Sequence, residues 1–113
     1  MVDYQGPRVD FATSAVNTTL VLTSTSTKPC FLRAVYVRYS GAAGTPVVTV
    51  TLNAGAGAGY DTLMNTISIA ANNQGAYIPA TPVPLAAGDV VDVSAAGVAA
   101  ITSSIMIYTD RGI

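Results

Sequence analysis

The sequence contains no histidine, no glutamate and no tryptophan, and charged residues make up only 10% of its 113 residues. Histidine is the side chain most often used for proton transfer near neutral pH, and it is also the commonest metal ligand. Its absence removes the usual base that would activate a serine nucleophile. We therefore expect a protein that is not an enzyme and that uses no cofactor and no metal ion.

A second scarcity is cysteine, because Cys30 is the only one and an intrachain disulfide is impossible. Its place at the start of an apolar run predicts a small buried side chain. Residues 1–8 lack the basic and apolar regions of a secretory signal. The small-apolar stretch 95–101 is far shorter than the roughly 20 residues of a membrane-spanning helix. We expect folding in the cytoplasm and no contact with a membrane.

The low charge also limits the partners that the chain can bind. Soluble domains typically carry about 25% charged residues, whereas this chain carries 10%. Its net charge is only −1. Its basic residues are scattered and form no stripe for direct binding of nucleic acid; they are Arg8, Lys28, Arg33, Arg38 and Arg111. A surface with so little charge repels its neighbours weakly, which favours a subunit docked against others.

What the sequence has in abundance is alternation of apolar and polar residues with a period of two, the pattern of half-buried strands. Gly- and Pro-rich turns separate the segments, and no helical repeat with capping signals occurs. The segments are 15–23, 30–40, 47–53, 61–70, 77–78, 90–94 and 100–108. We predict an all-β chain with essentially no helix, an antiparallel β-sandwich of seven to eight strands with jelly-roll or Greek-key wiring.

The alternation also predicts which side chains face the core. The expected inward residues are Val16, Leu20 and Leu22; Val48, Val50 and Leu52; Leu63, Ile67 and Ile69; and Ile101, Ser103, Ile105 and Ile107. Segment 30–40 differs because it is apolar on both faces, as expected of a central strand. Strict alternation there sends Arg33 and Arg38 to opposite faces, so either one arginine lies at the core edge or a bulge separates them. The outer face of this strand is covered either by another subunit or by the chain's own N-terminal arm.

Residues 1–12 do not follow the alternation, since Gly6-Pro7 interrupts the chain and charges lie among the apolar residues. We assign 1–12 to an N-terminal arm and 13–113 to a single domain. The arm either frays or becomes ordered on a neighbouring molecule through Tyr4 and Phe11.

Other motifs have plain structural interpretations. Gly55, Gly57 and Gly59 lack the spacing and the following helix of a phosphate-binding loop, which leaves a hairpin loop. Asp89 after Gly88 is a turn residue. Four tyrosines could stack on sugars if they shared one exposed face, but packing within the sheets explains them as well; they are Tyr36, Tyr39, Tyr60 and Tyr77.

Several features together carry a family resemblance. They are a polar strand after a short arm, the strand from Lys28 to Val37, the turn and strand from Pro84 to Val93, and the closing Ile105 to Tyr108. From about residue 13 onward the chain resembles the small β-sandwich virion proteins of tailed bacteriophages, particularly capsid decoration or cement proteins. The resemblance implies a homotrimer on the capsid surface that bridges neighbouring major capsid proteins and stabilises the head against DNA pressure.

No binding residues transfer from that family, so the candidate contacts rest on physical grounds. The apolar and cationic residues of the arm and the two arginines of segment 30–40 are the strongest, because aromatic and arginine side chains are enriched at protein interfaces. They are Tyr4, Arg8, Phe11, Arg33 and Arg38. Two alternatives remain open: a carbohydrate-binding β-sandwich module, and a structural subunit of a phage tail or neck.

Overall fold

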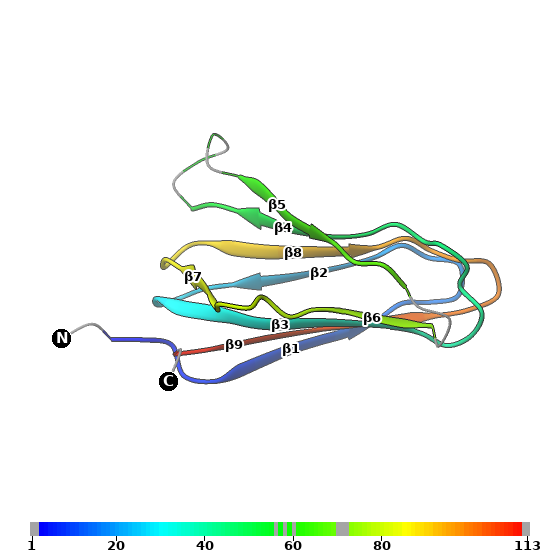
Figure 1. Cartoon of the computed structure of the whole chain (residues 1–113), viewed down its shortest axis with the longest axis horizontal. Coiled ribbons are helices and arrows are strands. Elements are labelled where there is room, and N and C mark those ends of the chain that lie inside the picture. Colours follow the sequence, from blue (N-terminus) through cyan, green and yellow to red (C-terminus); the bar gives the residue numbers. More distant parts are fainter. Residues whose placement is uncertain (1–2, 56, 58, 60, 70–72, 112–113) are drawn as a thin grey trace.

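The computed structural model describes residues 3–55, 57, 59, 61–69 and 73–111. In this part of the chain, antiparallel strands form two packed sheets and there is no α-helix, so the predicted all-β sandwich is confirmed (Figure 1). The strands are β1 Arg8–Thr13, β2 Leu20–Thr25, β3 Cys30–Tyr39, β4 Val48–Asn53, β5 Thr62–Thr66, β6 Gln74–Tyr77, β7 Val83–Leu85, β8 Val90–Ala95 and β9 Ser103–Asp110. The described residues include no helix able to span a membrane.

One sheet, here called sheet I, has the order β1-β9-β3-β6, and β7 also pairs with β3. The other, sheet II, has the order β2-β8-β4-β5. Strands β6 and β7 pair with successive parts of β3 and are two pieces of one interrupted strand. Pro79 and Pro82 lie in the interruption, where they lack the N–H group that a ladder needs. Nine strands occur rather than seven to eight because the predicted segments lacked β1 and β7. With β6 and β7 counted as one strand, the order of the two sheets matches a jelly roll.

Small aliphatic side chains fill the space between the sheets. Those that are fully buried include Leu32, Val35, Val37, Val48, Val50, Val91, Val93, Ile105 and Ile107. The inward faces predicted for segments 47–53 and 100–108 are therefore confirmed at their central positions. Cys30, 1% exposed, is also buried as predicted, with its Sγ 3.3 Å from Oγ of Ser26.

The strand predicted over 15–23 begins later, at Leu20. Asn17 has a φ of 56°, in the left-handed region that asparagine tolerates in turns. The turn leaves Val16 56% exposed, so its predicted inward position was wrong. Leu20 and Leu22 do pack in the core as predicted.

Two bulges change the predicted faces. In β5, Asn65 pairs with Val50 and Leu63 pairs with Thr51, so Met64 is the extra residue. Met64 packs against the core and Leu63 is 59% exposed, contrary to its predicted inward position. Ile67 and Ile69 face the core as predicted.

The second bulge lies in β3, where the pairing with β9 shifts between Leu32 and Ala34. Arg33 is the extra residue. Val35 and Val37 then continue the buried face that Leu32 began. The bulge therefore resolves the conflict between Arg33 and Arg38, because both arginines now avoid the core.

The N-terminal segment contributes to the sandwich. Residues 8–13, most of which the sequence assigned to an arm, form edge strand β1, which pairs with β9 from Arg8↔Thr109 onward. Gln5 is buried, and its amide Nε2 donates to Oγ1 of Thr109 at 3.3 Å, while its Oε1 accepts from the backbone N–H of Thr27. The segment extends sheet I at its edge and leaves the centre of the sheet's outer face uncovered.

Gly75 of β6 marks a close approach between chain segments. A methyl group there would lie 2.5 Å from the carbonyl oxygen of Ser68 and 2.7 Å from Cγ2 of Ile67. We expect Gly75→Ala to lower the free energy of unfolding by about 1–3 kcal/mol, the usual cost of overpacking. Urea denaturation measures this, with Gly6→Ala as control, because no atom lies near a methyl group there. Equal losses in the two variants would contradict the expected clash.

Tyr39 joins the two layers at one end, since its hydroxyl donates to the carbonyl oxygen of Ala96 at 2.7 Å and the side chain is 3% exposed. Burial raises the pKa of Tyr39 above its ordinary value of 10.0. Above pH 10.0 the unfolded chain therefore loses this proton before the folded chain does, and the free energy of unfolding falls. We expect Tyr39→Phe to cost about 1 kcal/mol near neutral pH.

This deficit of Tyr39→Phe should shrink as the pH rises above 10.0, because only the wild type loses stability through that phenol. Denaturation midpoints of both proteins across this range provide the measurement. A constant difference between them would show that Tyr39 ionises alike in the folded and unfolded chains.

Candidate functional site

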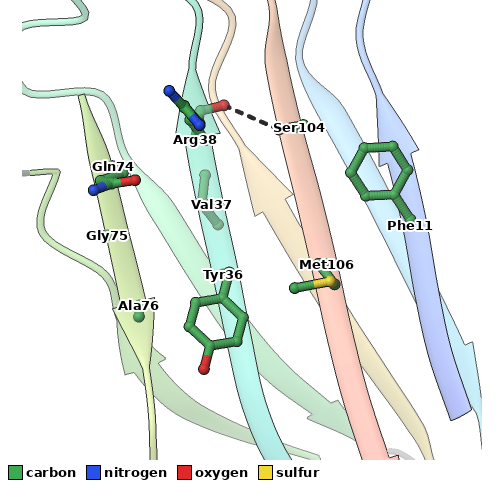
Figure 2. Close-up of a pocket in the computed structure, with 9 residues that line it drawn as sticks. All are labelled: Phe11, Tyr36, Val37, Arg38, Gln74, Gly75, Ala76, Ser104 and Met106. Atoms are coloured by element: carbon green, nitrogen blue, oxygen red, sulfur yellow. Dashed lines mark hydrogen bonds between the residues drawn. The ribbon is translucent and has the colours of Figure 1, made fainter. Parts of the chain in front are cut away.

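The outer face of sheet I carries a row of large apolar side chains. Phe11 of β1 pairs with Met106 of β9, Met106 pairs with Tyr36 of β3, and Tyr36 pairs with Ala76 of β6. Because residues opposite each other in a sheet point to the same side, the four side chains form one line across the sheet. Figure 2 shows the rings of Phe11 and Tyr36 on either side of Met106.

The surface is hollowed along this row. The hollow, which we call the trough, has a volume of about 640 Å³. Its lining residues are Phe11, Tyr36, Val37, Arg38, Gln74, Gly75, Ala76, Ser104 and Met106 (Figure 2). Phe11 is 62% exposed and Tyr36 is 42% exposed, so both rings are available to a partner.

A polar row borders the apolar one. Thr13, Ser104, Arg38 and Gln74 are paired in succession across β1, β9, β3 and β6. The hydroxyl of Ser104 donates to the carbonyl oxygen of Arg38 at 3.5 Å. The guanidinium of Arg38 forms no ion pair with any residue that the structure describes. The trough thus combines apolar side chains with one unneutralised cation.

Two further hollows continue the trough along the strands. One shares Phe11, Arg38 and Ser104 with it and reaches Thr13. The other shares Tyr36 and reaches Tyr108 and the ion pair of Arg33 with Asp110. The three hollows lie next to one another on the outer face of sheet I, and we refer to them together as the depression.

The outer face of sheet II has a different composition. Its central line pairs Thr23 with Asp92 and Asp92 with Thr51, and the next line pairs Ser94 with Thr49. The exposed large apolar side chains at this face are Val21 on edge strand β2, Leu63 on edge strand β5, and Val47, the residue that precedes β4 at its end. The two outer faces are therefore unequal, because aromatic and methionine side chains occupy the middle of one and Thr, Ser and Asp occupy the middle of the other.

The structure separates the five contact residues that the sequence singled out. Phe11 and Arg38 both line the trough. Tyr4 stacks on Phe31, with ring centroids 6.2 Å apart, near the start of β3. The guanidinium of Arg8 is engaged by its own chain, because it donates to Oγ of Ser24 at 2.8 Å and pairs with Asp10.

Arg33 lies at the far end of the depression, where its Nε donates to both carboxylate oxygens of Asp110 at 2.9 and 3.0 Å. Asp110 is 6% exposed, so this pair is shielded on one side. One N–H group shared between the two oxygens makes a bifurcated hydrogen bond, and the two charges neutralise each other. Arg33 is thus a structural cation at one end of the face, whereas Arg38, near the opposite end, forms no ion pair with the described residues.

Sequence reasoning missed Met106 and Tyr108 as parts of a surface. Both residues occupy the outward positions of β9, on the face that alternates with the predicted inward isoleucines. The sequence did contain a signal for this surface. Segment 100–108 has Met and Tyr on the face that alternates with its isoleucines, and segment 30–40 has Tyr36 on the face that alternates with its valines. Apolar residues on both faces of two strands indicate a sheet whose outer face is also covered.

The remaining motifs have structural roles. The carboxylate of Asp89 accepts from the backbone N–H groups of Ala86 at 2.8 Å and Gly55 at 3.0 Å, which confirms it as a turn residue. Gly55, Gly57 and Gly59 belong to the hairpin between β4 and β5, parts of which lie outside the described residues. No cluster of three potential metal ligands occurs among the described residues.

The four tyrosines considered for sugar stacking do not gather on one face. Tyr36 lies in the trough and is exposed, whereas Tyr39 is buried in the core. Tyr77 is half-buried and packs against the core from β6. Tyr60 lies outside the described residues.

No family model, no curated protein and no solved structure matches this chain.

Proposed function

We propose that this chain is a non-enzymatic structural subunit of a bacteriophage virion, a capsid decoration or cement protein that binds the major capsid protein through the outer face of sheet I. It is made in the host cytoplasm and resides on the capsid surface as a homo-oligomer, a trimer by family resemblance. In this arrangement the subunit bridges neighbouring capsid proteins and stabilises the head.

The inequality of the two outer faces carries this proposal. Contiguous exposed apolar patches on soluble domains mark interaction surfaces. Tyr, Phe, Met and Arg are enriched at protein interfaces while Lys, Glu and Asp are depleted, and the trough follows this rule through Phe11, Tyr36, Met106 and Arg38. The polar face of sheet II is suited to remain in water on the outside of a particle.

The architecture supports the same conclusion. Jelly rolls occur in viral capsid proteins and in lectins. The sequence lacks histidine, and the described residues hold no metal-ligating cluster. The trough has apolar side chains at its centre and polar ones at its border, which is the usual arrangement of a protein interface.

A substitution in the trough tests the docking face. We expect Phe11→Ser to weaken binding to phage particles that lack the chain by at least tenfold. Truncating an aromatic hot-spot residue costs about 2 kcal/mol or more, and each 1.4 kcal/mol is a factor of ten. The control is Leu63→Ser, which removes a similarly exposed apolar side chain from sheet II. Cosedimentation of the purified chain with the particles gives the affinities.

Four outcomes would contradict the proposal. The first is that mass spectrometry of purified particles detects no copy of the chain, and the second is that the chain is monomeric by native mass measurement and fails to bind particles. Binding that Leu63→Ser weakens and Phe11→Ser does not would place the interface on sheet II. Binding of oligosaccharides at Tyr36, with no binding to particles, would support the carbohydrate-binding alternative.

A further inference from the structure

The chemistry of a partner can be inferred from Arg38. Arg8, Lys28 and Arg33 each form an ion pair within the chain. Arg38 forms none with the described residues, and its side chain lines the trough beside the apolar row. A planar guanidinium presents several N–H donors in a fixed geometry that fits a carboxylate. The site therefore favours a partner that brings an anionic oxygen pair next to an apolar group.

The spacing within β3 fixes how far apart these two groups must be. Tyr36 and Arg38 are two residues apart on the same face of the strand, which separates them by about 6.6 Å. In an extended partner segment, side chains two residues apart also point to one side at the same spacing. A segment lying along the strands therefore matches the trough when a large apolar residue and an acidic residue stand two positions apart.

The length of the depression suits a segment rather than a small molecule. From Ser104 to Asp110 along β9 the distance is about 20 Å, the span of six residues in a strand. At the Asp110 end the charge is neutralised, because Asp110 pairs with Arg33. The polar side chains near Arg38 are Gln74 and Ser104, which add an amide and a hydroxyl as hydrogen-bonding groups. The unneutralised charge is thus confined to one end.

We propose, on the basis of the function proposed above, that the trough binds an extended segment of the major capsid protein that carries a large apolar residue and, two positions away, an aspartate or glutamate. The apolar side chain lies over Met106 between Phe11 and Tyr36. The carboxylate pairs with Arg38 and accepts a hydrogen bond from the side-chain amide of Gln74. Because the segment lies on the face of the sheet, its side chains rather than its backbone determine recognition.

A capped six-residue peptide provides a direct probe. It carries phenylalanine at its second position, aspartate at its fourth and threonine elsewhere. One control peptide has asparagine in place of aspartate, and another has the aspartate moved to the third position, where it points away from the phenylalanine. Backbone amide shifts of the full chain in nuclear magnetic resonance titrations report both the affinity and the location of binding.

We expect shifts confined to β1, β9, β3 and β6, and at least tenfold weaker binding of both control peptides. Arg38→Gln should weaken binding of the aspartate peptide at least tenfold, or 1.4 kcal/mol. The control Arg111→Gln removes the same charge from an exposed arginine that forms no ion pair with the described residues. Arg38→Asp with a lysine-containing peptide should restore binding, because the charges are exchanged.

Equal binding of the aspartate and asparagine peptides would overturn the inference, as would shifts on sheet II or no shift at millimolar peptide. These results are distinguishable from failure of the proposed function. If particle binding remains sensitive to Phe11→Ser but not to Arg38→Gln, the docking face is right and the acidic segment is wrong. If particles bind neither the wild type nor any variant, the proposed function itself is wrong.

Discussion

Strand β3 contributes side chains both to the core and to the outer face of sheet I, and the rest of the structure depends on this constraint. Its inward side chains, such as Val35 and Val37, fill the core between the sheets. Its outward side chains, Tyr36 and Arg38, build the trough. The strand also pairs with β9 on one side and with β6 and β7 on the other. The bulge at Arg33 lets the strand do this without placing a charge in the core.

Sequence periodicity predicted the layers well because burial and alternation are directly linked. The central residues of β4 and β9 face the core as the pattern required, since both strands are regular there. The pattern failed at Val16 and Leu63, where a left-handed turn and a bulge reversed the parity of the chain. A bulge adds one residue and leaves no obvious mark in composition, so a prediction made by alternation cannot place it.

The candidate site was harder to predict for a different reason. Phe11, Tyr36 and Met106 were visible in the sequence as single apolar residues, but their common row depends on the register of strands far apart in the chain. Tyr4 and Arg8 were singled out as contacts for the same chemical reasons as Phe11, yet neither lines the trough. Residue type predicts what a side chain is able to bind, whereas register decides which side chains act together.

The pairing of β1 with β9 has a mechanical consequence. Arg8, the first residue of β1, lies opposite Thr109, near the end of β9. A force that separates the start of β1 from the end of β9 therefore loads the hydrogen bonds of this ladder one after another, because they run perpendicular to the strands. Such an unzipping geometry resists little tension. A molecule built this way peels along this ladder when it is pulled from the start of β1 and the end of β9.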